Sequence, residues 1–359
     1  MSAHPVEVTH VSPTFVAEGG VWGGGDRYAY ELALAMAGHV STRLVTFGPR
    51  RRRMRAGPLR IQVLPLRWHV RGHDVNPMSE LLAPALLAGR VLHAHQYESL
   101  VTNLVVLAAR ATGRPAFATD LGGGGANVSR ALTPLLSGML ALCEFATSFY
   151  PELAARTRVI GGGVDVERFR SDGGPRRREV VYVGRLLPHK GIDVLIEAMP
   201  PDVPLRVCGR TLDPAYRELL GRLAHGKQVI FEESPTDAQV LDAYRRARVA
   251  VLPSVEHSPH RDVAPKSELL GLVLLEAMAC GTPVVCARTG PMPEIVREGE
   301  TGYVVPPNDA GALGQRIREL LDGGRRWDAM SEAGAAWVRS EHTWDRVAQR
   351  ALRAYDELG

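Results

Sequence analysis

The sequence predicts an α/β protein built from two doubly wound domains with parallel sheets, and three observations lead to this prediction. The chain has 359 residues, more than a single hydrophobic core usually holds. Short β-branched runs alternate with helical patterns almost throughout, which is typical of βαβ units. The alternation stops once, over the polar stretch 164–179, and then resumes. This stretch is therefore predicted to link two domains, 1–165 and 176–340.

The predicted strands are short apolar runs that follow one another along the chain. In the first half they are VEVTHVS, TRLVTF, IQVLPL, VLHAH, PAFATD and RVIGGGV; in the second half they are EVVYVGRL, LRVCG, QVIFEE, ARVAVLPS, PVVCAR and GYVVPP. Helices of the second half are expected near 191–199, 214–225, 237–247 and 272–280. Residues 309–358 predict almost continuous helix with breaks near Gly323 and His342. The chain should thus close on helices rather than on another strand.

The composition is that of a soluble globular protein. Hydrophobic residues make up 45% of the chain and charged residues 23%, so disorder is not expected. The N-terminus lacks a basic segment followed by an apolar one, and no uncharged apolar run reaches the ~18 to 20 residues that span a bilayer. The four cysteines stand in no C-x-x-C spacing, which predicts reduced thiols. We expect a cytoplasmic protein, either soluble or bound peripherally at a membrane.

The basic character of the chain lies in its first half, and much of it belongs to the run Arg50 to Arg55. Pro49 and Gly57 flank this run, which predicts a loop. An arginine cluster of this kind suits phosphates or anionic lipid head groups. A solvated loop in an arginine-rich protein is an equally good interpretation.

Two glycine-rich segments follow predicted strands of the first half. In the first, Gly23 to Gly25 leave the backbone bare enough for a phosphate or sugar to approach, and Asp26 is predicted to cap the next helix. The spacing is not G-x-G-x-x-G, which disfavours a nicotinamide site; a plain glycine-rich turn is the alternative. The second segment, Thr119 to Gly125, is expected to be a flexible loop lining a cleft.

Two histidines, His93 and His95, end the strand VLHAH and should point to the same side of the sheet. An H-x-H pair is compatible with a metal site, but no third histidine, cysteine or acid stands at ligand spacing nearby. We therefore predict no metal site. One histidine should face the cleft and the other should pack inside.

Two cations, Arg185 and Lys190, follow the first strand of the second half across a proline. In a doubly wound sheet, ligands bind beyond the carboxyl ends of the strands, so this pair is placed to clamp a diphosphate without a metal. A solvated pair of basic residues is the alternative.

Two acids, Glu268 and Glu276, stand in the mostly apolar stretch SELLGLVLLEAMACGTPVV. Gly271 is expected to end an irregular segment, so that a helix begins near Leu272 and its free amides form an anion site. The carboxylates would then flank a bound phosphate from different sides. Because an ionised acid in apolar company needs hydrogen-bond partners, we expect ligand hydroxyls to reach Glu276. Surface exposure of both acids is the alternative, and it fits this sequence poorly.

Four segments together resemble retaining glycosyltransferases of family 4, which have the two-domain GT-B fold. They are VVYVGRLLPHKGIDVLIEAM, ELLGLVLLEAMACGTPVV, PEIVREGETGYVVPPND and TWDRVAQRALRAYDEL. The resemblance covers almost the whole chain and is strongest over residues 179–308. It implies two Rossmann-like domains with a cleft between them and C-terminal helices that cross back to the first domain, which assigns 341–359 to a helix packed on that domain.

The resemblance also implies roles for single residues. Glu276 would bind the nucleotide ribose, and Glu268 the hydroxyls of the donor sugar. The diphosphate would lie against Arg185 and Lys190. The remaining residues that it implicates are the backbone amides of Gly271 and Leu272 beside the diphosphate, the glycine pair Gly23 and Gly24, and the cleft histidine His95. Catalytic roles are thus expected for Glu268, His95, Arg185 and Lys190, and no metal ligands.

The sequence departs from the family pattern at two places. Glu232 and Glu233 stand where the family usually has a glycine, which puts recognition of the base in doubt. The segment 255–267 is longer than the common form, and we expect it to shape the pocket of the donor sugar. The match of the first half is looser, as expected if this half binds a particular acceptor.

The resulting prediction is a retaining transfer of a hexose-type sugar from a nucleoside-diphosphate donor, expected to be UDP-linked, to an acceptor held by the first domain. Because Glu268 is committed to sugar hydroxyls, no enzymic nucleophile is evident, and a metal-independent front-face mechanism is favoured. No cofactor is expected, since the nucleotide sugar is a substrate. Expected partners are that donor and a sugar, glycolipid or small-molecule acceptor, with contact to anionic membrane and no nucleic acid. The alternatives are an epimerase or hydrolase of the same fold, or a non-catalytic sugar-nucleotide-binding protein.

Overall fold

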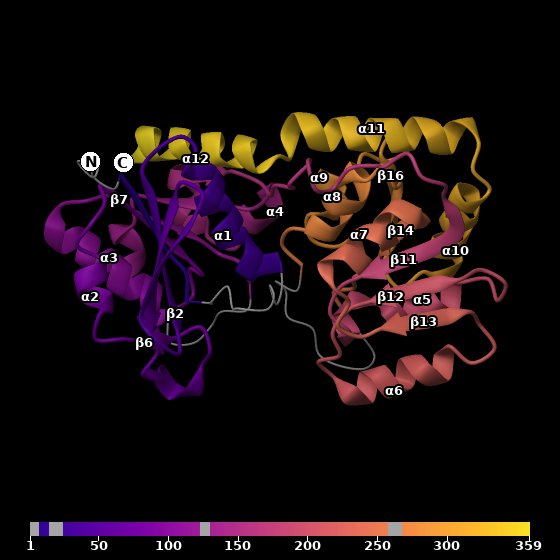
Figure 1. Ribbon diagram of the computed structural model, residues 1–359, viewed down its shortest axis with the longest axis horizontal. Helices are drawn as coiled ribbons and strands as arrows, with labels where there is room; N and C mark the ends of the chain where they lie inside the picture. Colours follow the sequence, from indigo (N-terminus) through magenta and orange to yellow (C-terminus); the bar gives the residue numbers. More distant parts are fainter. Residues whose placement is uncertain (1–6, 14–23, 123–129, 258–267) are drawn as a thin grey trace. The chain divides into compact units, whose positions relative to one another are not determined.

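The protein is described by a computed structural model that covers residues 7–13, 24–122, 130–257 and 268–359. The chain divides into two compact units. The first comprises Met1–Gly163 together with Trp344–Gly359, and the second comprises Val164–Thr343. Both are α/β units with one main parallel sheet, as the alternating pattern predicted (Figure 1). No helix among the described residues has both the length and the apolar character needed to cross a bilayer.

The first unit is organised around an eight-stranded sheet in the order β10-β9-β8-β7-β1-β2-β4-β3. All neighbours are parallel except β3 and β4. The strands are β1 (Val8–Val11), β2 (Thr42–Gly48), β3 (Arg52–Ala56), β4 (Leu59–Pro65), β7 (Val91–His95), β8 (Ala116–Thr119), β9 (Gly138–Ala141) and β10 (Thr157–Val159). The strands that follow β1 in the chain, β2 to β4, lie on one side of β1, and the later strands, β7 to β10, lie on the other side. The boundary between β1 and β7 is therefore the switch point, where ligands bind in doubly wound sheets.

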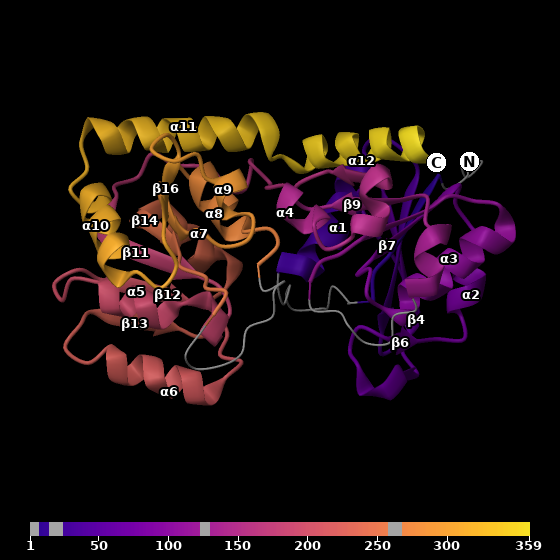
Figure 2. The ribbon, with the colours of Figure 1, turned by 180° about the vertical axis from the view of Figure 1, so that it is seen from behind.

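Helices cover the sheet of the first unit. The longer ones are α1 (Gly24–Met36), α3 (Leu100–Thr112) and α12 (Trp344–Leu358), and the short ones are α2 (Leu82–Ala85) and α4 (Glu144–Thr147). The 3₁₀ turns are η1 (Val70–Gly72), η2 (Arg130–Leu135) and η3 (Pro151–Arg156), and a two-stranded ribbon joins β5 (Trp68–His69) to β6 (Pro77–Met78). Helix α12 packs against α1 and also contacts β9 (Figures 1 and 2). The C-terminal helix thus returns to the first unit, as the fold prediction required.

The arginine run is not a loop, contrary to the sequence prediction. Residues Arg52–Ala56 form β3, an antiparallel edge strand whose Arg52 pairs with Val63 of β4. The middle residues of β3 are exposed, so their charged heads stay in water while the backbone completes the ladder. Charged side chains are common on edge strands because they prevent further strand pairing. Because most side chains of this run are charged and exposed, the sequence lacks the alternation of apolar and polar residues that predicts a strand.

The second unit has a six-stranded parallel sheet in the order β13-β12-β11-β14-β15-β16. Its strands are β11 (Arg177–Val183), β12 (Leu205–Cys208), β13 (Val229–Glu232), β14 (Ala247–Leu252), β15 (Val284–Ala287) and β16 (Gly302–Val305). Its helices are η4 (Pro188–Lys190), α5 (Ile192–Ala198), α6 (Pro214–Leu223), α7 (Asp237–Arg246), α8 (Leu272–Ala279), α9 (Met292–Ile295), α10 (Ala310–Leu321) and α11 (Arg325–Glu341). Every strand and helix predicted for this half is present. The switch point lies between β11 and β14.

The breaks between the last three helices also match the prediction. Helix α10 ends before Gly323, whose φ of 73° is a left-handed value that suits glycine. Helix α11 ends at Glu341, and α12 begins at Trp344 after a short non-helical segment around His342. The chain passes from the second unit to the first in this segment.

Candidate functional site

In the second unit, Glu268 and Lys190 meet near the carboxyl ends of the switch-point strands. Lys190 ends the turn after β11, and its Nζ lies 2.5 Å from Glu268 Oε2. The hydroxyl of Ser254, which follows β14, donates to the same oxygen at 3.0 Å. The side chains of Lys190 and Glu268 are only 10% and 12% exposed. The structure therefore places a buried ion pair where the sequence predicted two separate ligand-binding groups.

The surroundings of Glu268 keep it ionised. Burial alone would raise the pKa of this carboxyl, but the Lys190 ammonium, together with hydrogen bonds from Lys190 and Ser254, lowers the pKa overall. By contrast, Arg185 is exposed. The two cations of the predicted clamp thus have different surroundings: Lys190 is paired inside the protein, and Arg185 faces solvent.

Gly271 and Leu272 begin helix α8 as predicted. Gly271 has a φ of 59°, a left-handed value that favours glycine over residues with a Cβ. Leu272 is the first helical residue, and the amides at this end of α8 have no helical acceptor. A helix start of this kind attracts anions.

Glu276, one turn into α8, is 8% exposed and receives a hydrogen bond from the Tyr244 hydroxyl at 3.2 Å. Tyr244 belongs to α7 and is fully buried; burial, and next the Glu276 charge, raise the pKa of its phenol well above the usual value. The prediction expected ligand hydroxyls to satisfy this carboxylate, whereas a protein hydroxyl already provides one hydrogen bond. Sequence reasoning missed Tyr244, because an aromatic residue on a helix is usually no more than a core residue.

The two acids at the end of β13, Glu232 within the strand and Glu233 just after it, contact neighbouring side chains. Glu233 accepts from the Thr211 hydroxyl at 2.6 Å and from Arg217 Nε at 2.8 Å. The Arg217 guanidinium also lies 3.8 Å from the centre of the Phe231 ring. Glu232 accepts a weak hydrogen bond from the Cys208 thiol at 3.5 Å. The departure from the family glycine is thus part of a polar surface network.

The glycine segments of the first unit are only partly within the described residues. Gly23 lies outside them, and Gly24 is the first residue of α1. Because the helix already begins at Gly24, Asp26 lies inside its first turn and is not the predicted cap. Thr119 is the last residue of β8, and Asp120 to Gly122 form neither helix nor strand, as predicted. Thr119 is buried, and its hydroxyl is bonded to His93, as described next. The last three residues of this second segment, Gly123 to Gly125, lie outside the described residues.

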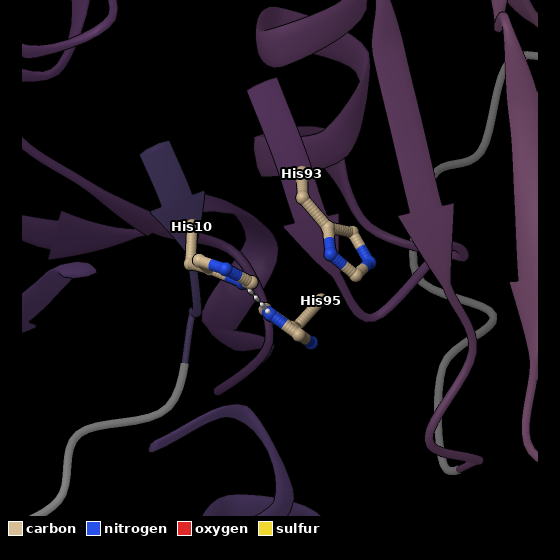
Figure 3. Close-up of side chains that lie close together, drawn as sticks. All are labelled: His10, His93 and His95. Atoms are coloured by element: carbon tan, nitrogen blue, oxygen red, sulfur yellow. Dashed lines mark hydrogen bonds between the residues drawn. The ribbon is translucent and has the colours of Figure 1, made fainter. Parts of the chain in front are cut away.

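Three histidines meet at the switch point of the first unit, where the sequence predicted two. His10 from β1 joins His93 and His95 from β7, and Figure 3 shows the three rings close together. His10 Nδ1 lies 2.9 Å from His95 Nε2. His93 and His95 lie on one side of the strand as expected, but all three rings are fully buried, so neither of the two is open to solvent. The third histidine was missed because it is 83 or more positions away in the chain.

All three imidazoles are held neutral. Burial lowers the pKa of His10 to about 3. It also lowers the pKa values of His93 and His95 well below the usual value, with further lowering from the neighbouring imidazoles. One ring nitrogen from each residue lies within 4.8 Å of the others, a spacing compatible with a metal ion. Protein groups already occupy most of these nitrogens, since His93 is bonded to Tyr355 at 2.7 Å and to Thr119 at 2.8 Å.

Comparison with known proteins identifies the second unit. Residues 165–337 match the family model described as glycosyl transferases group 1. A GDP-mannose-dependent α-(1-6)-phosphatidylinositol monomannoside mannosyltransferase of Mycolicibacterium smegmatis is 34% identical over 222 residues, 56% of this chain and 56% of that protein. A D-inositol 3-phosphate glycosyltransferase of Acidothermus cellulolyticus is 31% identical over 258 residues, 65% of this chain and 55% of the relative. The chain spans just over half the length of these curated relatives.

The solved structures extend the likeness to the fold of both units. Anabaena HepE in complex with UDP and glucose superimposes with a TM-score of 0.75 at 18% identity, over 98% of this chain and 100% of the other. At this identity the likeness concerns the fold alone. The family model thus identifies the second unit as a group 1 glycosyl transferase unit, and the fold of the chain is GT-B.

Proposed function

We propose that the protein transfers a hexose from a nucleoside-diphosphate sugar, bound by the second unit, to an acceptor bound by the first. The observation that carries this proposal is the buried group of Glu268, Lys190 and Ser254 at the switch point of the unit that matches the family. A carboxylate that stays ionised inside the protein is suited to grip sugar hydroxyls. Glu276 would bind the ribose, with Tyr244 orienting its carboxylate.

The proposed chemistry needs no enzymic nucleophile and no metal. The bond from the anomeric carbon to the diphosphate oxygen breaks, and the acceptor oxygen bonds to that carbon on the same face. Because the acceptor attacks from the face that the diphosphate leaves, the configuration at the anomeric carbon is retained. The leaving phosphate takes the acceptor proton. Exposed Arg185 and the free amides at Gly271 and Leu272 would stabilise the departing charge, and Lys190 would reach it from its pair with Glu268. We assign His95, with Gly23 and Gly24, to binding in the first unit.

We consider two candidate donors, which differ in the nucleobase. The sequence led us to expect a UDP-linked sugar. The curated relatives from Mycolicibacterium and Mycobacterium carry names that specify GDP-mannose, which favours GDP-mannose as the second candidate. Both donors have the same ribose and diphosphate, so the groups around Glu276 and α8 serve either one.

The acceptor that we propose is a polyol or a glycolipid. Several relatives are named for inositol phosphate or phosphatidylinositol acceptors, which makes these two the first compounds to try. The exposed arginines of β3 are suited to the anionic surface on which a lipid acceptor would lie. Vesicles with anionic lipid should then raise the transfer rate at low salt, and replacing the exposed Arg53 and Arg55 by serine should remove that increase.

A donor screen tests the proposal. The protein is incubated with UDP-, GDP- and ADP-sugars, with and without an inositol phosphate or lipid acceptor, and both the free nucleotide and the glycosylated product are measured. Acceptor-dependent release of nucleotide, unchanged by EDTA, is the expected result. Equal turnover without any acceptor would instead indicate a hydrolase or epimerase, and tight binding without turnover a binding protein. Activity lost in EDTA and restored by magnesium would contradict the metal-independent chemistry.

A further inference from the structure

The sulfur of Met36 determines which nitrogen of His10 carries a proton. Met36 is the last residue of α1, is fully buried, and places its Sδ 3.2 Å from His10 Nε2. A thioether accepts hydrogen bonds and cannot donate one. His10 must therefore donate from Nε2, because the alternative would set a nitrogen lone pair against the sulfur lone pairs.

The protonation of His10 in turn fixes the proton of His95. His10 is neutral, with a pKa of about 3, so a proton on Nε2 leaves Nδ1 as a bare acceptor. That acceptor lies 2.9 Å from His95 Nε2, which must then donate (Figure 3). His95 is also neutral and has a single ring proton, located on Nε2. Its other nitrogen, Nδ1, is left as a lone pair.

The Nδ1 atom of His95 is fully buried and has no hydrogen-bond partner among the described residues. The side-chain nitrogen of the next residue, Gln96, is also buried and has no hydrogen-bond partner among the described residues. Gln96 has a φ of 78°, a left-handed value that is rare for residues other than glycine and is often found at functional sites. A bare acceptor and a bare donor on consecutive residues are complementary to a hydroxyl, which both donates and accepts.

We propose that Met36 and His10 hold His95 with its proton on Nε2, so that Nδ1 accepts a hydrogen bond from a substrate hydroxyl at the switch point of the first unit. This rests on the proposed function only for the identity of the substrate. In this arrangement Met36 and His10 are positioning residues, and His95 contacts the hydroxyl. A carboxylate or phosphate oxygen would be rejected, because it brings a lone pair to a lone pair.

The other possible uses of this histidine cluster fit the contacts less well. His93 has a hydroxyl partner on each ring nitrogen, Tyr355 on one and Thr119 on the other, so it has no nitrogen free for a substrate. A metal ion held by all three rings would need a lone pair from each at one point. Both nitrogens of His10 and both nitrogens of His93 already contact protein groups, so a metal ion would have to displace some of these contacts.

Nuclear magnetic resonance of the free protein, labelled with [¹⁵N]histidine, tests the protonation directly. Long-range proton–nitrogen spectra distinguish a protonated from a bare ring nitrogen, and a His95→Gln variant assigns the signals of His95. The expected result is a bare Nδ1 and a protonated Nε2. A proton on His95 Nδ1 in the parent protein would overturn the proposal; only the assignment of the signals uses a variant.

Variants then test how the arrangement is set. Met36→Leu removes the sulfur at similar volume and should give a mixture of the two protonation states of His95. Leu32→Met, one turn earlier on α1 and outside this hydrogen-bond chain, is the packing control and should leave His95 unchanged. His10→Gln keeps a carbonyl acceptor for His95 Nε2 and should preserve the parent state, whereas His10→Leu should lose it. If Met36→Leu and His10→Leu both leave His95 in the parent state, the two residues do not set it.

Kinetics separate this inference from the proposed function. Losing one hydrogen bond to a hydroxyl should weaken acceptor binding, seen as a KM raised about fivefold to tenfold in His10→Leu with recovery in His10→Gln. Donor KM should not move. If the spectra show the expected proton but no acceptor is ever glycosylated, the assignment of His95 stands and the proposed function fails. If transfer occurs and the acceptor KM of both His10 variants equals that of the parent protein, the hydroxyl does not bind at His95.

Discussion

The two switch points of this protein are built from opposite chemistry. In the second unit, Lys190 and Glu268 are a buried ion pair, and the carboxyl stays charged because its partner is 2.5 Å away. In the first unit, three fully buried imidazoles stay neutral: His10 and His95 share a hydrogen bond, and His93 is bonded to the hydroxyls of Tyr355 and Thr119. A charged site is suited to the diphosphate and the hydroxyls of a sugar nucleotide, whereas a neutral imidazole acceptor is suited to a hydroxyl and not to an anionic oxygen. Two units of the same α/β type can therefore offer binding sites of different chemistry to two different substrates.

The strongest test of this contrast is acidification. Each buried neutral histidine binds a proton more readily when unfolded, so the free energy of unfolding falls as pH drops below about 6.5, by up to ~1.4 kcal/mol per pH unit for each of the three. The lowered pKa of Glu268 has the same sign but acts only below its ordinary value of 4.5. Hydrogen exchange measured from pH 7 to 4 should show β7 losing protection before β14. Simultaneous loss in both strands would remove the distinction between the units.

Breaking the ion pair should have the next largest effect. Lys190→Met leaves the Glu268 carboxylate buried without its cation, which should lower the free energy of unfolding by about 3 kcal/mol or more at pH 7. Lys190→Met combined with Glu268→Gln removes the uncompensated charge and should recover part of the loss. The exposed pair Arg67 and Glu80 is the control, and Arg67→Met should leave the unfolding midpoint nearly unchanged. Denaturant titration measures all three, and equal losses for Lys190→Met and Arg67→Met would show that burial does not matter here.

Replacing Glu268 and replacing Glu276 should have different effects on nucleotide binding and on turnover. Glu276 is assigned to the ribose, which is the same in ground and transition states, so Glu276→Ala should weaken binding of the free nucleoside diphosphate. Glu268 is assigned to the sugar while charge develops at its anomeric carbon, so Glu268→Ala should lower kcat with nucleotide affinity retained. Each loss should be on the order of 1.5 to 3 kcal/mol, or roughly one to two decades. Calorimetry that finds nucleotide binding weakened equally by both changes, or by neither, would show these roles to be wrong.

The smallest expected effect sharpens the role of Tyr244. Tyr244→Phe removes one hydrogen bond to Glu276 and keeps the ring, so nucleotide binding should weaken by about 0.5 to 1.5 kcal/mol. Tyr216→Phe removes a comparable bond to Asp193 in the same unit and serves as the matched control. Nucleotide affinity that falls equally in both variants would mean that the phenols act only through stability.

How far the sequence predicted these sites depended on how far apart their residues lie in the chain. In the second unit, Glu268, Gly271, Leu272 and Glu276 occupy one short segment, so spacing alone placed them around a helix start. The histidine cluster draws on β1, α1, β7 and α12, and no local pattern joins His10 or Met36 to His95. Strand β3 was missed for a different reason, since its arginines hide the alternation that identifies a strand. Long-range contacts and solvated edges are the features that a single sequence conceals.

Helix α12 comes last in the chain but belongs to the first unit, and this affects the order in which the protein can assemble. Residues 344–359 belong to the first unit but are synthesised only after residues 164–343, which form the whole second unit. At about 5 to 20 residues per second, a ribosome needs roughly 10 to 40 s to bridge that gap. At the end of this interval the second unit has all of its strands and helices, while His93 still lacks the Tyr355 hydroxyl that bonds to its Nδ1. The unit translated first is therefore the one that must be completed last.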